Sequence, residues 1–182
     1  MRNLLFAAAI VLTGIFFLTS NTASTDILYW SPDHRLTWDD FKGFPSYQHT
    51  EISALTASGI VHYKGCQDGF INYKVQAYFE RKESWVKSEA LTDHHLIHEQ
   101  IHFDITEIHA RKVRKALSQR KFRCGQENEF EIFVAALTDD WQNDQRKYDE
   151  ETKHSLDEEK QVQWHQHVTS ELYQLDDFET TD

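Results

Sequence analysis

Alternation of apolar and polar residues predicts a β-hairpin in the first half of the chain. Residues 54–63 and 70–79 are rich in β-branched and aromatic side chains, which favour extended strands. Asp68 and Gly69 lie between these segments and are typical turn residues. A third short strand is expected near residues 84–86. The pattern therefore predicts an N-terminal hairpin or small antiparallel sheet.

The apolar spacing becomes helical in the second half of the chain, which contains no proline. Thr92 or Asp93 can cap a helix in which apolar residues stay close to helical spacing as far as about Leu117. Two further helices are expected, one over residues 130–141 and one over residues 164–175. We predict an α+β fold in which a long helix and two more follow the sheet.

Residues 27–42 form the part of the chain before the hairpin, where Pro32 and Pro45 break any regular pattern. We expect an irregular segment there, held by aromatic side chains, with one helical turn. The chain has 182 residues, of which 40% are apolar, and this is enough for one domain with a core. We therefore expect a single domain over residues 24–182.

The N-terminus has the layout of a secretory signal. Met1–Asn3 carries a positive charge, the run at residues 4–18 is almost entirely apolar, and small polar residues follow. The apolar run is short for a membrane span, which needs roughly 20 residues. We expect a signal peptide at residues 1–23 and export to the periplasm or beyond, with an uncleaved membrane anchor as the alternative.

Acidic residues outnumber basic ones by 30 to 19, which gives a net charge of −11. This excess of negative charge argues against sequence-independent binding to the phosphates of a nucleic acid. Residues 111–123 contain seven basic and no acidic side chains, whereas residues 125–182 contain seventeen acidic and four basic ones. We expect the acidic C-terminal helices to pack near the basic stretch.

Cys66 and Cys124 are the only cysteines of the chain. In an exported protein they could close one disulfide that joins the hairpin to the end of the long helix. The sequence leaves two alternatives open, a disulfide and a pair of separate buried thiols.

The chemistry is concentrated at His98, Glu99 and His102, which form an H-E-x-x-H arrangement on the predicted long helix. Positions four apart lie on one helix face, so both imidazoles can bind one zinc ion. Glu99 lies about 100° around the helix from His98, where it can take a proton from zinc-activated water and pass it to a leaving amine. The motif predicts a metallopeptidase; the alternative is a set of polar residues on a histidine-rich helix.

Other polar residues of this helix are poor candidates for the third zinc ligand. His94 and His109 lie at other turns of a straight helix and cannot converge on the same ion as the motif histidines. Asp104 and Glu107 point away from the motif, so we expect them either to support the metal ligands from outside or to take part in helix packing. The third ligand must therefore come from a separate element.

Residues 148–154 are the richest downstream source of such a ligand. We choose His154, with Glu151 as the first alternative and His165 or His167 as weaker ones. A helix C-terminal cation is the structural alternative for His154.

Three blocks of the chain resemble one bacterial family, classed as a domain of unknown function and described as predicted secreted zinc-dependent proteases. These blocks are Arg35–Pro45, His98–Arg111 and Tyr148–His154. The resemblance implies a zincin-like fold, with the motif histidines as ligands, Glu99 as catalytic acid and the block that ends at His154 as the source of the third ligand. Ser155 departs from the family pattern, where we expect glycine.

Together these features predict an exported zinc metallopeptidase that acts on a peptide or protein substrate. We expect an extended substrate to pair with an edge strand, for which residues 72–79 are the candidate. Tyr148 is a candidate donor to the oxyanion. The alternative function is a non-catalytic exported envelope protein that uses the same ligands as a structural metal site.

Overall fold

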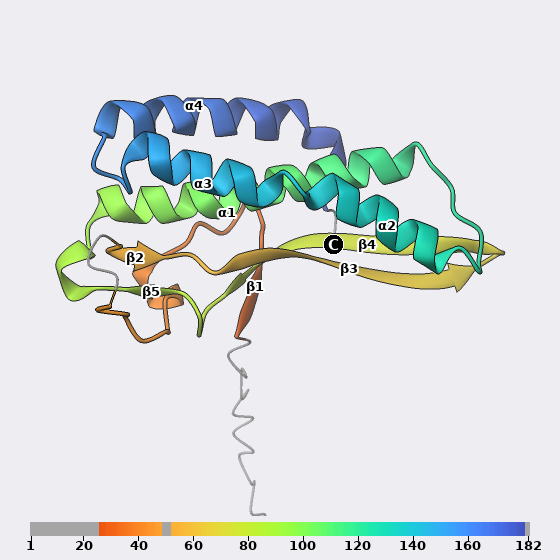
Figure 1. The fold of residues 1–182 in the computed structure, drawn as a ribbon, viewed down its shortest axis with the longest axis horizontal. Coiled ribbons are helices and arrows are strands. Elements are labelled where there is room, and N and C mark those ends of the chain that lie inside the picture. The colour runs from red at the N-terminus through yellow and green to blue at the C-terminus, as the bar shows by residue number, and fades with distance from the viewer. Residues whose placement is uncertain (1–25, 49–51, 181–182) are drawn as a thin grey trace, which may run out of the picture.

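The protein is described here by a computed structural model that covers residues 26–48 and 52–180, so the expected signal segment lies outside the described residues. A twisted antiparallel sheet forms one layer, a long helix lies along it, and further helices pack against that helix (Figure 1). The expected α+β class with a small antiparallel sheet is confirmed. None of the described helices combines the length and apolar character that a membrane span requires.

The predicted hairpin is present as β3 (Ser58–Gln67) and β4 (Phe70–Glu80). Asp68 and Gly69 connect the two strands, and both have positive φ angles, 52° and 79°. This is the conformation that a tight two-residue hairpin turn requires. The short strand β1 (Ile27–Tyr29) pairs with the other side of β4, so the strand order is β1-β4-β3.

The first strand begins later than expected because residues 54 and 55 belong to a different sheet. β2 (Ala54–Leu55) pairs with β5 (Trp85–Val86), which confirms a third short strand near residue 85. β4 lies between β1 and β3. β1 pairs only with Tyr78, Phe79 and Glu80, so among the described residues most of 72–79 have β3 as their one strand partner, and their role as a substrate-binding edge stays a prediction.

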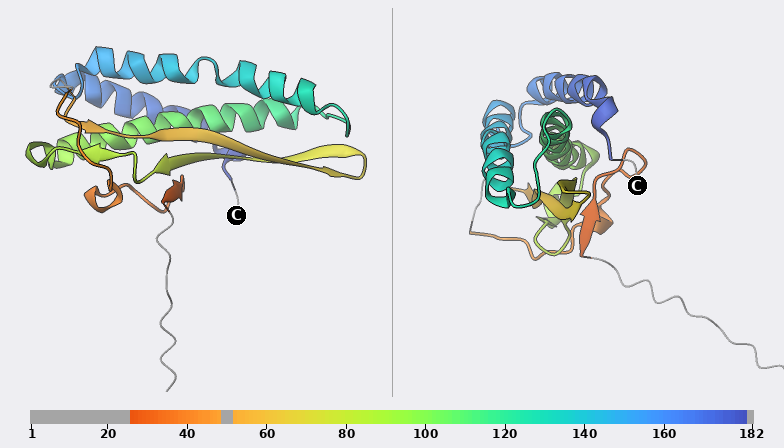
Figure 2. Two further views of the ribbon diagram at one scale, coloured as in Figure 1. Left: turned by 60° about the horizontal axis from the view of Figure 1, so that its bottom comes forward. Right: turned by 90° about the vertical axis from the view of Figure 1, so that its right-hand side faces the viewer.

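The long helix α1 (Asp93–Ser118) has the expected bounds and lies at the centre of the molecule (Figure 2). Thr92 caps it, since its hydroxyl accepts a hydrogen bond from the backbone N–H of His95. One face of α1 packs on the sheet, and the opposite face contributes to a second apolar cluster with the C-terminal helices. Because both faces are covered, polar side chains in the middle of α1 are also buried.

Three α-helices follow α1 where two were expected: α2 (Glu127–Thr138), α3 (Trp141–Thr152) and α4 (Glu158–Gln174). The helical structure is interrupted between α2 and α3, at Asp139 and Asp140. The apolar pattern runs across this break, but its members pack into different cores: those of α2 face the sheet, and Trp141 faces the α1, α3 and α4 cluster. Sequence periodicity alone could not reveal this change of partner.

Two contacts join parts of the chain that lie far apart in the sequence. Cys66 and Cys124 form a disulfide that joins the end of β3 to the loop after α1, which decides between the two alternatives left open. The acidic C-terminal region contacts the basic stretch of α1, with Lys112 Nζ 3.1 Å from Glu171 Oε2 and Arg111 Nη2 2.8 Å from Glu179 Oε2. The expected packing of these two regions is confirmed.

Asp40 fastens the N-terminal segment to the sheet at the end of the expected helical turn, a 3-10 helix over Trp38–Asp40. Its Oδ2 accepts hydrogen bonds from the backbone and the hydroxyl of Thr37, at 2.9 and 3.0 Å, and its Oδ1 accepts one from Arg81 at 2.7 Å. Burial alone would raise the pKa of Asp40, but the Thr37 hydrogen bonds and the charge of Arg81 hold it below its usual value.

We expect Asp40→Asn to lower the free energy of unfolding by about 1–2 kcal/mol at pH 7. A carboxyl whose pKa is depressed by folding stabilises the protein above its unfolded pKa, and this contribution disappears as the pH falls through the folded pKa. Urea unfolding at pH 7 and near pH 3 should therefore show that the gap between variant and wild type narrows in acid. An equal gap at both pH values would contradict this role of the carboxylate.

Candidate metal centre

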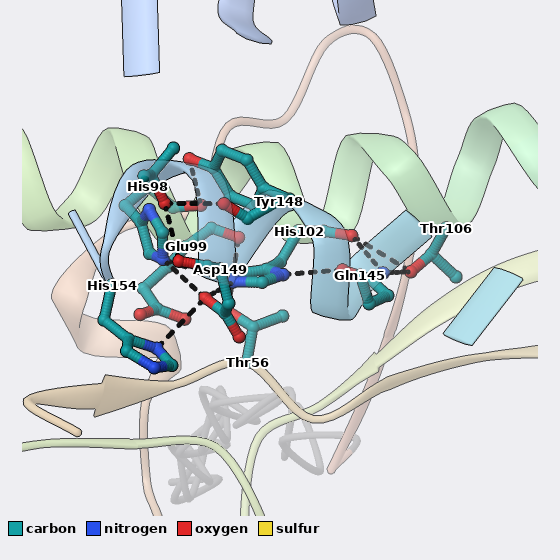
Figure 3. Close-up of polar contacts among 10 residues, drawn as sticks. Thr56, His98, Glu99, His102, Thr106, Gln145, Tyr148, Asp149 and His154 are labelled. Atoms are coloured by element: carbon teal, nitrogen blue, oxygen red, sulfur yellow. Dashed lines mark hydrogen bonds and ion pairs between the residues drawn. The ribbon is translucent and has the colours of Figure 1, made fainter. Parts of the chain in front are cut away.

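Three donor atoms converge where α1 crosses α3, as Figure 3 shows. Nε2 of His98 and Nε2 of His102 lie 3.2 Å apart, and Oδ1 of Asp149 lies 3.1 Å from the first and 3.0 Å from the second. Among the described residues, these form the group able to hold a metal ion. The structure thus brings the two motif histidines together with a carboxylate that sequence reasoning did not select.

The face of α3 that points toward α1 explains why Asp149 reaches the site. Gln145, Tyr148, Asp149 and Thr152 follow the spacing i, i+3, i+4, i+7, which places their side chains on one side of the helix. A residue two positions after Asp149 points to nearly the opposite side of the helix. Glu151 accordingly turns away, and its Oε2 accepts a hydrogen bond from Trp164 Nε1 at 2.9 Å. The stripe was readable in the sequence as the signal for Asp149.

His154, the ligand chosen from the sequence, lies beside the cluster but not within it. Its Nδ1 is 3.4 Å from Asp149 Oδ1, and its side chain is 43% exposed. Lys153, His154 and Ser155 all have positive φ angles, 51°, 53° and 74°, which non-glycine residues rarely adopt in succession. Ser155 thus has the backbone conformation that favours the expected glycine.

His165 and His167, the weaker alternatives, belong to α4. Neither is among the residues that line the cavity at the cluster. His167 instead packs its ring against that of Trp164, with centroids 5.8 Å apart. The structure therefore does not bring these two histidines to the site.

Glu99 lies in a cavity of about 270 Å³ between α1, α3 and residues 52–58. Its Oε2 is buried and has no hydrogen-bond partner. Thr56 Oγ1 donates to the backbone carbonyl of Glu99 at 3.2 Å, which ties the opposite wall of the cavity to α1. Burial raises the pKa of Glu99 above its usual value, against the opposing effects of the nearby His102 and Thr56. Its carboxylate is therefore a stronger base than an exposed one.

The pKa values of the two motif histidines shift in opposite directions. Burial lowers the pKa of His98 to about 4, although Asp149 partly opposes the shift. Burial also acts to lower the pKa of His102, but the hydrogen bond and charge of Asp149 and the charge of Glu99 outweigh it and raise the pKa to about 9. The same contacts lower the pKa of Asp149 far below its usual value, against the effect of burial. Without a metal, Asp149 therefore favours the protonated ring of His102, and a metal at Nε2 would have to displace the proton on that nitrogen.

Tyr148 does not occupy the position expected of an oxyanion donor. Its side chain is fully buried and stacks on the His98 ring, with centroids 4.6 Å apart. Its hydroxyl points to the backbone carbonyl of His98 at 3.5 Å. Burial raises its pKa well above the usual value. Tyr148 supports the His98 ring and does not face the cavity.

The other polar residues of α1 have packing roles, one of the two roles expected of Asp104 and Glu107. Asp104 Oδ1 accepts a hydrogen bond from Trp30 Nε1 at 2.9 Å, and Glu107 Oε1 accepts one from Arg111 Nε at 2.9 Å. His94 Nε2 lies 2.6 Å from the backbone carbonyl of Ser155. None of these groups belongs to the three-atom cluster among the described residues.

Residues 71–155 match the family described as "Bacterial protein of unknown function (DUF922)". This part of the chain is therefore similar to the DUF922 family. This region extends from β4 to Ser155 and contains all the cluster residues. No curated protein and no solved structure matches the chain. The expected relation to a bacterial family of unknown function is supported, and proteolytic activity stays a prediction, because the family description names no activity.

Proposed function

We propose that this protein is an exported zinc-dependent metallopeptidase with a zincin-like active site. One observation carries the proposal: Nε2 of His98, Nε2 of His102 and Oδ1 of Asp149 converge beside the unpartnered carboxylate oxygen of Glu99. The two imidazoles and the Glu99 carboxylate are the groups that the H-E-x-x-H spacing predicts. Asp149 adds a third donor from α3, and all four side chains face one cavity.

The donor set fits zinc. Ligands of a tetrahedral zinc ion with bonds of about 2.0–2.1 Å are separated by about 3.3 Å, and the three donor atoms here are 3.0–3.2 Å apart. Two imidazoles and one carboxylate are also a common donor set of catalytic zinc sites. When bound, zinc would act as a Lewis acid that polarises a substrate carbonyl and makes a nearby water molecule more acidic.

Glu99 is the residue that would move the proton. It follows His98 directly, so it borders the cluster without being one of the three converging donors. In the proposed reaction its carboxylate accepts a proton from water as the water attacks the peptide carbonyl, and it later donates this proton to the leaving nitrogen. The raised pKa of Glu99 makes its carboxylate a better proton acceptor than an exposed glutamate.

Residues 52–58 are a further candidate for the substrate-binding segment. They line the cavity opposite Glu99 and His102, and among the residues that the structure describes β5 is the one strand paired with β2. An extended peptide could add as a further strand, held by main-chain hydrogen bonds. This arrangement supports a peptide or an unstructured protein segment as substrate.

The disulfide supports the proposed export. Bridges such as Cys66–Cys124 form and persist in oxidising compartments and are rare in the cytosol. The N-terminal residues 1–23 have the layout of a signal peptide.

The position of His154 supports one alternative function, in which the cluster is a closed structural metal site. Its Nδ1 lies 3.4 Å from Asp149 Oδ1, close enough for a small movement to supply a fourth ligand. Structural zinc sites have four protein ligands, whereas catalytic sites keep one position open. The cavity beside Glu99 favours the open, catalytic arrangement.

Hydrolysis of casein tests the proposed function. We expect the purified protein to bind one zinc ion per chain and to hydrolyse unstructured casein slowly. A chelator should abolish the hydrolysis and added zinc should restore it, because without metal the water and the carbonyl lose their activation. Zinc uptake without hydrolysis of casein or of a mixed peptide library would support the structural alternative, and no zinc uptake would contradict both functions.

A further inference from the structure

Gln145 holds the outer nitrogen of one motif histidine. It lies on α3 one turn before Asp149, and its Oε1 is 2.5 Å from Nδ1 of His102 (Figure 3). Its Nε2 donates to the backbone carbonyl of His102 at 2.9 Å and to Thr106 Oγ1 at 3.0 Å. Because both donor contacts go to oxygen atoms, the orientation of the carboxamide is determined, and the atom that faces the ring is the oxygen.

This contact decides which nitrogen of His102 keeps its proton when the other nitrogen binds a metal. A carboxamide oxygen can only accept a hydrogen bond, so the ring must present Nδ1–H to Gln145. The lone pair of Nε2 is then the one available to a metal, and Nε2 is the atom that faces Asp149 and His98. Outer partners of metal-binding histidines fix ring orientation and tautomer in this way.

Gln145 is itself held by a network that does not depend on a metal. Thr106 Oγ1 accepts hydrogen bonds from Gln145 Nε2 and from Trp141 Nε1, the latter at 3.1 Å, and it lies 3.1 Å from the backbone carbonyl of His102. Ser58 Oγ, from β3, is 2.8 Å from the same Thr106 oxygen. The carboxamide is thus connected to α1, α3 and the sheet, so it can hold the ring before any ion arrives.

We propose that Gln145 is a positioning residue that keeps the proton of His102 on Nδ1 and so presents Nε2 as the metal-binding atom. The inference rests on the metal site of the proposed function but not on hydrolysis. A neutral carboxamide does this beside Glu99 and Asp149 without adding a third negative charge to the buried cluster. Loss of its oxygen should weaken zinc binding even though Gln145 does not touch the ion.

The test compares Gln145→Leu, which removes the acceptor, with Gln145→Glu, which keeps one. The matched control is Gln142→Leu, at an exposed position of the same helix. We expect Gln145→Leu to raise the zinc dissociation constant by about 10–100-fold. Gln145→Glu should stay within about tenfold of wild type and Gln142→Leu should equal wild type. Competition with a chromophoric chelator measures these constants, with circular dichroism as the check on folding.

A spectroscopic readout separates positioning from a general loss of structure. In protein with ¹⁵N-labelled histidine, the Nδ1–H proton of His102, assigned by its absence in His102→Gln, should be visible and protected from exchange with water. It should persist in Gln145→Glu and lose its protection in Gln145→Leu. An unchanged Nδ1–H signal and unchanged zinc affinity in folded Gln145→Leu would overturn the inference. A wild type that takes up no zinc would instead overturn the proposed function, while the Nδ1–H signal of the zinc-free protein would still test the role of Gln145.

Discussion

Glu99→Gln is expected to keep zinc binding and to lower kcat for peptide hydrolysis by about 10²–10⁴-fold. Glutamine has nearly the shape of glutamate, but its neutral carboxamide cannot accept a proton from water. Glu99 is outside the three-atom cluster, and its Oε2 makes no hydrogen bond, so the change removes no contact of that oxygen. The loss should therefore appear in kcat and leave the zinc content at one ion per chain.

The control for this experiment is Glu129→Gln, the same substitution at an exposed position of α2. It should not change the hydrolysis rate. Zinc content by elemental analysis and casein hydrolysis under excess substrate measure the two properties separately. Turnover at the wild-type rate in zinc-loaded Glu99→Gln would show that another group accepts the proton.

Local patterns explain which parts of the fold could be predicted from the sequence. The turn at Asp68 and Gly69 and the cap at Thr92 depend on a few adjacent residues, and both are present as expected. The separate pairing of β2 with β5 and the break between α2 and α3 depend on which core each apolar side chain joins. The periodicity of apolar residues shows which side chains are expected to face a core, but it does not show which other elements they pack against.

The same distinction applies to the site. His98 and His102 could be placed together because helix geometry alone relates positions four residues apart. The carboxylate that joins them comes from α3, and its choice depended on the rotation of that helix about its axis. Tyr148 and Thr152 are fully buried on the face that carries Asp149, whereas Glu151 lies on the opposite side. A ligand search restricted to the face marked by Tyr148 would have selected Asp149 from the sequence.

Asp149→Ala is expected to weaken zinc binding by more than about 100-fold, beyond the range typical of outer partners. The substitution removes the charged donor that lies 3.0–3.1 Å from both imidazole Nε2 atoms. It also removes the carboxylate that orients the two rings toward one point. The two remaining nitrogens are fewer than the three protein ligands of a catalytic zinc site, and they are less well oriented. Asp149→Asn should fall between wild type and Asp149→Ala, because it keeps a neutral oxygen at the same position.

His154→Ala and Glu151→Ala are the matched comparisons, since each removes one side chain that the sequence offered as the third ligand. His154 lies outside the three-atom cluster, and the Glu151 carboxylate is bonded to Trp164. Both variants should therefore bind zinc with nearly wild-type affinity in the same chelator competition. If His154→Ala loses zinc while Asp149→Ala retains it, the ring of His154 must move in to bind the ion and Asp149 must serve only to orient the imidazoles.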